Sequence, residues 1–176
     1  MKKIIIVVLV IIGITVFNNK QQEVLIPKEA IRFRIIANSD NKVDQEAKLI
    51  VRDKIETQIT NDLTKTSNRE EARKTLKENI NNYENIVSKT LKDNNLETDF
   101  SINYGMNYFP EKKYKGVKYE SGDYESLVVT LGNGLGKNWW CVLFPPLCLL
   151  EGEEEQETEE VEYKFFVQEM IEKFLK

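Results

Sequence analysis

The spacing of apolar positions changes its period several times along this chain. Apolar and polar residues largely alternate over residues 31–36, which is typical of a half-buried strand. From about residue 42 to residue 62 apolar residues recur every three or four positions, and this spacing predicts an amphipathic helix. Asn38, Ser39 and Asp40 stand between these segments and are candidate helix caps.

A second helical pattern follows, and after it the period falls to two. Ser67 and Glu70 have the spacing of a capping box, which predicts that the second helix begins there. Asn94 and Asn95 mark its expected end. The next segment predicts a strand whose inward face carries Phe100, Ile102, Tyr104 and Met106.

The order of these elements predicts an α+β fold. One strand, two helices and then a run of strands favour a single domain, with two helices packed on one face of a mainly antiparallel sheet. The expected organisation has an apolar N-terminal signal or anchor with its tether, the α+β domain, an acidic linker and a short C-terminal amphipathic helix. Whether the last helix docks on the sheet or binds a partner or membrane stays open. These four parts span residues 1–22, 23–150, 151–162 and 163–176.

Residues 138–148 hold both tryptophans and both cysteines of the chain, in the order Asn-Trp-Trp-Cys-Val-Leu-Phe-Pro-Pro-Leu-Cys. The apolar run is too short to span a membrane and predicts a buried strand. The adjacent Trp139 and Trp140 must point to opposite faces of that strand. Two interpretations remain open: a strand that serves only the core, or one that also presents a recognition surface.

The N-terminus has the layout of an export signal. Lys2 and Lys3 precede residues 4–17, which are apolar except for Gly13 and Thr15. As a helix this segment would be about 21 Å long, against about 30 Å for the core of a bilayer. We expect an export signal that is either cleaved or kept as an anchor; the alternative is a buried helix of a cytosolic protein.

Composition narrows the chemistry that the chain can perform. It contains no histidine, which excludes triads and metal sites that depend on histidine. If the chain is exported, Cys141 and Cys148 are candidates for a disulfide. Two thiolates cannot complete a zinc site, so we expect no metal. We expect no cofactor either. Seven of the acidic residues lie between residues 151 and 160 and predict a solvated linker. Basic residues do not interleave with aromatic ones, so we expect no nucleic-acid partner.

Few other residues suggest a reaction. The glycine-rich segment 132–137 lacks two required positions of a phosphate-binding loop and is interpreted as a hairpin connection. Asp40, Asp44 and Asp53 lie within fourteen residues, and two of these carboxylates could in principle serve a hydrolase. Nothing fixes their separation, and we expect no enzyme. Arg32 and Arg34 share one face of the first strand, where they either bind a partner's carboxylate or lie on a solvated sheet face.

Several motifs resemble one protein family over about residues 26–151. They comprise Ile-Arg-Phe-Arg-Ile-Ile-Ala-Asn-Ser-Asp at 31–40, Gly-x-Tyr-Glu-Ser-Leu at 122–127 and Leu-Gly-Asn-Gly-x-Gly-x-Asn-Trp-Trp-Cys at 131–141. Together they resemble the stage II sporulation protein R family of endospore-forming bacteria. Glu120 departs from the pattern, since proline is expected there, and this affects one turn.

The resemblance implies an exported signalling protein rather than an enzyme. Such proteins leave the forespore, enter the space facing the mother cell and activate a membrane-embedded aspartic protease that processes pro-sigma-E. On this reading we expect Trp139, Trp140, Arg32 and Arg34 to contact the protease, because binding sites are enriched in tryptophan and arginine. The resemblance implies no small-molecule substrate. The alternative is an extracytoplasmic module that binds cell wall or membrane.

Overall fold

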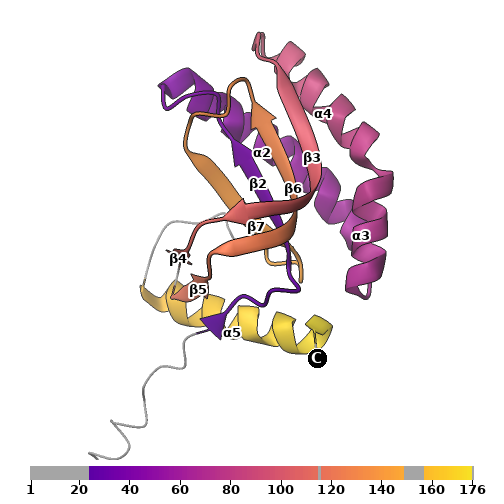
Figure 1. Cartoon of the computed structure of the whole chain (residues 1–176), viewed down its shortest axis with the longest axis vertical. Coiled ribbons are helices and arrows are strands. Elements are labelled where there is room, and N and C mark those ends of the chain that lie inside the picture. The colour runs from indigo at the N-terminus through magenta and orange to yellow at the C-terminus, as the bar shows by residue number, and fades with distance from the viewer. Residues whose placement is uncertain (1–23, 115, 149–156, 176) are drawn as a thin grey trace, which may run out of the picture.

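The computed structural model describes residues 24–114, 116–148 and 157–175, which form an α+β fold (Figure 1). The predicted export signal at residues 4–17 lies outside the described residues, as does part of the predicted linker. No helix in the described ranges is long and apolar enough to cross a membrane. In chain order the elements are β1 (Val24–Leu25), β2 (Ile31–Ile36), α2 (Lys42–Leu63), α3 (Arg69–Glu78), α4 (Ile80–Asp93), β3 (Phe100–Phe109), β4 (Lys112–Tyr114), β5 (Val117–Tyr119), β6 (Gly122–Leu131), β7 (Asn138–Phe144) and α5 (Glu157–Leu175).

The main sheet is mixed, with the strand order β3-β6-β2-β7. Strand β2 pairs parallel with β6 and antiparallel with β7, while β3 and β6 are antiparallel. The expectation of a mainly antiparallel sheet therefore missed the central parallel pair. That pair forms because the chain between β2 and β6 crosses through the helices and β3, a connection long enough to return a strand in the same direction.

The segment 132–137 is not a hairpin connection, because β2 lies between the two strands that it joins. It crosses the end of β2 and bonds to the residues that follow that strand. Leu135 N–H donates to the Asn38 carbonyl at 3.0 Å, and Gly136 N–H donates to the Ala37 carbonyl at 2.9 Å. A Cβ atom on Gly136 would lie 2.3 Å from the Ser39 carbonyl oxygen. Glycine is required here because two backbone segments approach each other so closely.

Helix α2 follows its predicted range closely, but its cap is not one of the three predicted residues. The cap is Asn41, whose side-chain oxygen accepts from Asp44 N–H at 2.8 Å. Asn38 and Ser39 instead donate to the Asp44 carboxylate, at 3.0 and 2.6 Å. Polar residues after β2 therefore hold the turn into α2 through one shared carboxylate.

The second predicted helix is divided at Asn79 into α3 and α4. The cap of α3 is Asn68, whose side chain accepts from Glu71 N–H at 2.9 Å. The capping box predicted for Ser67 and Glu70 is therefore wrong by one position. The reciprocal bond of such a box is still present in shifted form, since the Glu71 carboxylate accepts from Ser67 N–H at 2.8 Å.

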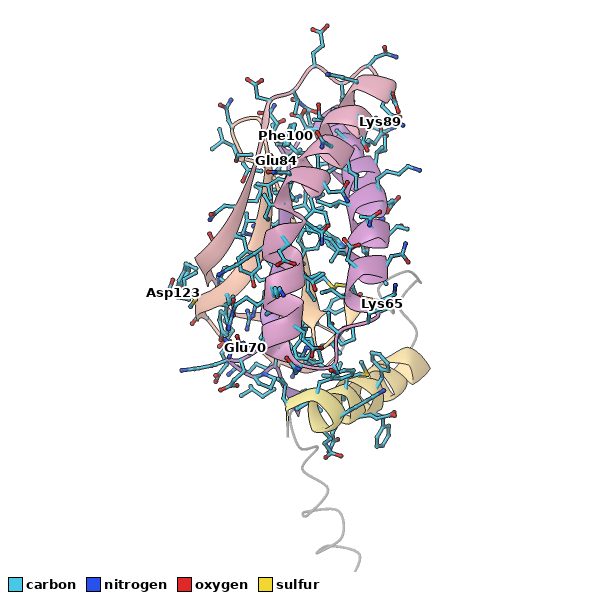
Figure 2. All side chains as sticks on the ribbon, turned by 90° about the vertical axis from the view of Figure 1, so that its right-hand side faces the viewer. Lys65, Glu70, Glu84, Lys89, Phe100 and Asp123 are labelled. Atoms are coloured by element: carbon cyan, nitrogen blue, oxygen red, sulfur yellow. A yellow bond between two sulfur atoms is a disulfide. The ribbon has the colours of Figure 1, made fainter. Side chains whose placement is uncertain are left out.

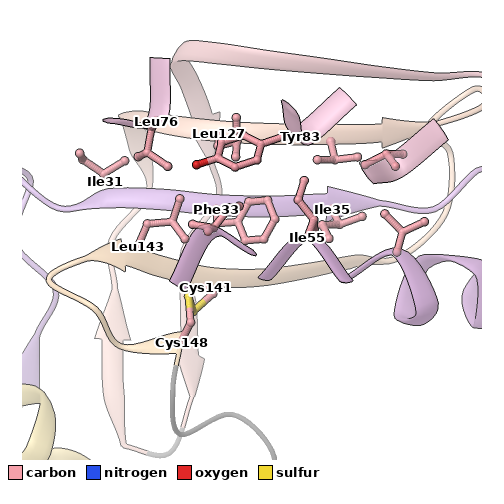
Figure 3. Packing of buried hydrophobic residues seen from close by; sticks show 14 of the residues in the cluster. Ile31, Phe33, Ile35, Ile55, Leu76, Tyr83, Leu127, Cys141, Leu143 and Cys148 are labelled. Carbon is pink, nitrogen blue, oxygen red and sulfur yellow. A yellow bond between two sulfur atoms is a disulfide. The ribbon is translucent and has the colours of Figure 1, made fainter. Parts of the chain in front are cut away.

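Helices α2, α3 and α4 cover one face of the main sheet and enclose the larger core (Figure 2). Strand β2 contributes alternate residues to it, as the sequence predicted. Figure 3 shows Phe33 between β2 and the helices, with the disulfide at the border of this core. Its fully buried side chains include Ile31, Phe33, Ile35, Val51, Ile55, Ile59, Leu76, Tyr83, Val87, Leu127 and Val129.

The second face of the main sheet is also covered. Strands β3 and β6 curve across it (Figure 1), so that Phe109 at the end of β3 contacts Trp140 of β7. The burial predicted for β3 ends before Met106, which is 66% exposed, because the strand leaves the helices beyond that point. The small sheet β1-β5-β4 continues this second layer.

Helix α5 docks on the second layer and closes a smaller core. It begins at Glu157, earlier than the predicted start at residue 163, and so includes part of the predicted linker. Val167 is fully buried in this core against β1, β5 and β7. Near the C-terminal end of α5, Phe174 reaches the larger core and stacks edge to face on Phe144, with ring centroids 5.4 Å apart. The docked alternative for the last helix is thus the one that the structure has.

Candidate partner-binding site

Trp139 and Trp140 point to opposite faces of β7, as predicted. The Trp139 ring stacks edge to face on Phe33 at 5.6 Å, on the side of the helices. The Trp140 ring stacks on Phe109 at 5.5 Å, on the side of the second layer. Both side chains are only half-buried. Each tryptophan therefore contributes to packing and still reaches the surface.

A pocket of about 270 Å³ lies where these two side chains meet the surface. Strand β7 is an edge of the main sheet in the described structure, so the pocket can receive residues from both of its faces. Helix α2 supplies lining on one side, and the small sheet supplies it on the other. The lining residues are Arg52, Lys112, Tyr114, Tyr119, Asn138, Trp139 and Trp140.

Two cations lie at this pocket, one at each tryptophan. The Arg52 guanidinium lies 5.6 Å from the Trp139 ring centroid, and the Lys112 ammonium lies 5.3 Å from that of Trp140. Arg52 also pairs at 2.7 Å with Asp53, whose side chain is 62% exposed. Among the residues that the structure describes, no acidic side chain lines this pocket. The site therefore combines aromatic surface with positive charge, which suits a partner that carries carboxylates.

Arg32 lies beneath this region rather than at its surface. It is 1% exposed, and its guanidinium carbon lies 3.4 Å from the centroid of the Tyr124 ring. None of its three guanidinium nitrogens has a hydrogen-bond partner in the described structure. Burial lowers its pKa. Its charge is thus held by aromatic faces, those of Tyr124, Phe109 and Tyr119.

Arg34 is half-buried on the same face of β2. Its Nη1 donates to the Tyr108 carbonyl at 3.3 Å, and its guanidinium carbon lies 4.8 Å from the Phe109 ring centroid. The interpretation of a solvated sheet face is therefore wrong for both arginines, because the curved strands cover it. Phe109 contacts Arg32, Arg34 and Trp140, so the arginines support one side of the pocket indirectly.

A disulfide joins Cys141, in the middle of β7, to Cys148 beyond its end, with Cα atoms 5.6 Å apart. The chain turns back between them, and Leu147 N–H donates to the Val142 carbonyl at 3.1 Å. Pro145 and Pro146 stand in this turn, where β7 has ended. The disulfide therefore fixes the turn that follows the strand with both tryptophans.

The carboxylates considered for catalysis have separate structural contacts. Asp40 accepts from Lys137 N–H at 2.7 Å and thereby anchors the loop that crosses β2. The Asp44 carboxylate accepts from Asn38 and Ser39 at the start of α2, and Asp53 pairs with Arg52. None of these contacts brings two of the three carboxylates together.

The sequence did not indicate the site of Glu125 of β6, a carboxylate that three side chains contact. It accepts from Arg73 Nε at 2.5 Å, from Arg69 Nη2 at 3.0 Å and from the Tyr104 hydroxyl at 2.9 Å. The hydrogen bonds from Arg73 are the main reason that its pKa falls to about 2. The available signal in the sequence was the pair Arg69 and Arg73, one turn apart on the polar helix α3, which could share one carboxylate. Their common partner on β6 is distant in sequence and could not be read from it.

Comparison with known proteins matches this chain to one family. The family model described as stage II sporulation protein R matches residues 27–154. The stage II sporulation protein R of Bacillus subtilis (strain 168) is 39% identical over 151 residues, covering 84% of this chain and 67% of that protein. No solved structure matches the chain significantly. The site on β7 lies inside the matched range, and the chain belongs to the stage II sporulation protein R family.

Proposed function

We propose that this chain is an exported sporulation signal that activates the membrane-embedded aspartic protease processing pro-sigma-E in the mother cell. Membership of the stage II sporulation protein R family carries this proposal. The half-buried tryptophans and the two cations at the edge pocket support it, because such a surface suits recognition of another protein.

In the proposed mechanism, binding favours the active state of the protease. A partner shifts such an equilibrium only by its difference in affinity for the two states. Trp139 and Trp140 make the direct contacts in this mechanism. Arg34 and the buried Arg32 act indirectly, since they hold Phe109 against Trp140.

The proposed location is the space between forespore and mother cell. Residues 4–17 direct export and are then removed or kept as an anchor, with the basic N-terminus on the cytoplasmic side. A disulfide between Cys141 and Cys148 fits an oxidising compartment of this kind. The proposed function requires no cofactor.

Reconstitution in a non-sporulating bacterium tests the proposal. The host expresses this chain, the protease and pro-sigma-E, and processing is followed by the mobility of sigma-E on a gel. We expect processing with the intact chain and at least a tenfold loss with Trp139→Ala/Trp140→Ala. Absence of processing with a competent protease and exported chain contradicts the proposed function.

The matched control is Tyr108→Ala, which removes an aromatic side chain that is 60% exposed outside the pocket. This variant should process pro-sigma-E as the intact chain does. Pull-down by purified wall material or lipid vesicles separates the alternative binding module from the signal. Retention there, combined with no processing, would favour the alternative.

A further inference from the structure

The open edge of β7 carries backbone groups as well as side chains. In the described part of the chain β7 has a neighbouring strand only on its β2 side. The Val142 carbonyl points away from β2, since it accepts from Leu147 N–H beyond the strand. Backbone groups along a strand face alternate edges, so those of Trp140, two residues earlier, face the same open edge. Trp140 is one of the residues that line the pocket described above.

The side chains around this edge are arranged in pairs on its two sides. Trp139 and Arg52 lie on the helix side, while Trp140 and Lys112 lie on the side of the small sheet. A strand added to β7 would direct successive side chains to these two sides in turn. Two adjacent residues of that strand would therefore meet one tryptophan and one cation each.

We propose that β7 binds an extended peptide segment with two adjacent acidic residues, which adds to the main sheet as a further strand. Backbone hydrogen bonds at Trp140 supply affinity, and the two cations select the carboxylates. Arg52 already contacts Asp53, whose side chain is 62% exposed, so a peptide carboxylate must bind beside this carboxylate or displace it. This deepens the proposed function, on which it rests, by giving the protease segment a conformation and a charge.

The added strand must be short. Pro145 and Pro146 follow β7 and lack backbone N–H groups, and the Val142 carbonyl is already taken by Leu147. In the described structure the free edge thus extends over about residues 138–141. A segment of this size binds through its backbone and a few side chains, and charge complementarity then determines which sequence is preferred.

Peptide binding to the purified, oxidised chain tests the proposal without the protease. The probe is the octapeptide Thr-Val-Thr-Glu-Glu-Thr-Val-Thr, compared with the same peptide carrying Gln-Gln in the centre. Trp139 and Trp140 are the only tryptophans of the chain, so their fluorescence reports binding at this site. We expect the Glu-Glu peptide to bind at least tenfold more tightly. Equal affinities, or no binding of either peptide at millimolar concentration, overturn the proposal.

Two further comparisons test the cations and the backbone separately. Arg52→Gln/Lys112→Gln should reduce the preference for Glu-Glu at least fivefold, whereas Lys74→Gln, a cation on α3 outside the pocket, should leave it unchanged. Methylation of the peptide nitrogens along one edge should weaken binding at least tenfold, and methylation along the other edge less than threefold. Equal effects at both edges contradict strand addition. Processing in the reconstituted system, if peptide binding fails, would keep the proposed function and assign its contact to another surface.

Discussion

A buried arginine without a carboxylate partner is uncommon in a protein core, and Arg32 is one in the described structure. Alternation along β2 correctly placed it beside Arg34 on one face. The sequence could not show that this face is buried. The residues that cover it come from β3 and β6, which are distant in sequence from β2 and curve over it. A local pattern gives the face of a side chain but not what lies on it.

We predict that Arg32→Met leaves stability within about 1 kcal/mol of the original chain. The substitution removes the cost of burying an unpaired charge and keeps most of the volume, while the contact with the Tyr124 ring is lost. Arg32→Ala should cost about 2–4 kcal/mol, because it leaves a cavity. Urea unfolding of both variants measures this. A loss of more than about 2 kcal/mol in Arg32→Met would contradict the prediction and show that the cation on the Tyr124 ring stabilises the core.

Glu125→Gln should make stability less dependent on pH. The pKa of Glu125 is lowered from 4.5 to about 2 in the fold, so its ionised form stabilises the protein above pH 4.5. That contribution disappears as the pH falls toward 2. We expect the variant to lose about 1–3 kcal/mol at pH 7 and progressively less below pH 4.5.

Urea unfolding at several pH values measures the effect of Glu125→Gln. Glu78→Gln is the control, since Glu78 is exposed and its distance from Lys74 is 3.9 Å. Its effect should stay below about 0.5 kcal/mol. A constant difference between Glu125→Gln and the original chain across the pH range would contradict the prediction.

At the scale of elements, the sequence predicted the ranges of helices and strands well, but it did not predict which strands are neighbours in the sheet. The ranges of β2 and α2 followed from periodicity because each signal lies within one segment. The loop at 132–137 was misjudged, since glycines mark a turn without showing which strands it separates. The edge pocket combines α2, β4, β5 and β7, so only its tryptophans could be anticipated from the sequence.

The loop that crosses β2 yields a prediction about its glycine. Gly136→Ala should destabilise the chain by about 2–4 kcal/mol, because the new methyl group would collide with the Ser39 carbonyl and with the Ala37 side chain. Gly105→Ala is the matched control, since nothing lies within 4 Å of a Cβ atom there. Thermal unfolding of the two variants gives the comparison. Similar melting temperatures would mean that the loop can move away at little cost.

At the scale of the whole molecule, two cores lie on opposite faces of the main sheet. The smaller core depends on α5, whose docking the sequence had left open because an amphipathic face does not identify what it packs against. The predicted fold class is correct, whereas the second layer of small strands was not anticipated as a separate sheet. Strands of two or three residues are too short for a periodic signal.

We predict that Val167→Asp releases α5 and leaves the larger core folded. A charge placed at this fully buried position cannot be accommodated among apolar neighbours. Hydrogen exchange should show at least a tenfold loss of protection in α5 and unchanged protection in α2 and β2. Phe165→Asp, at a position 68% exposed, should change neither. Loss of protection throughout would show that both cores unfold as one unit.

The position of β2 has a consequence for the order in which the chain can fold as it is synthesised. Strand β2 comes first among the strands of the main sheet, yet its two neighbours are β6 and β7, which are synthesised last. The pairing of β2 with β6 needs the chain up to residue 131, and that with β7 needs it up to residue 144. Such distant contacts form slowly. If the chain is exported as proposed, its main sheet stays unfolded for most of its synthesis, and an unfolded chain can pass through a secretion channel. Its own topology delays folding until the whole domain has been made, which favours completion of the sheet on the far side of the membrane.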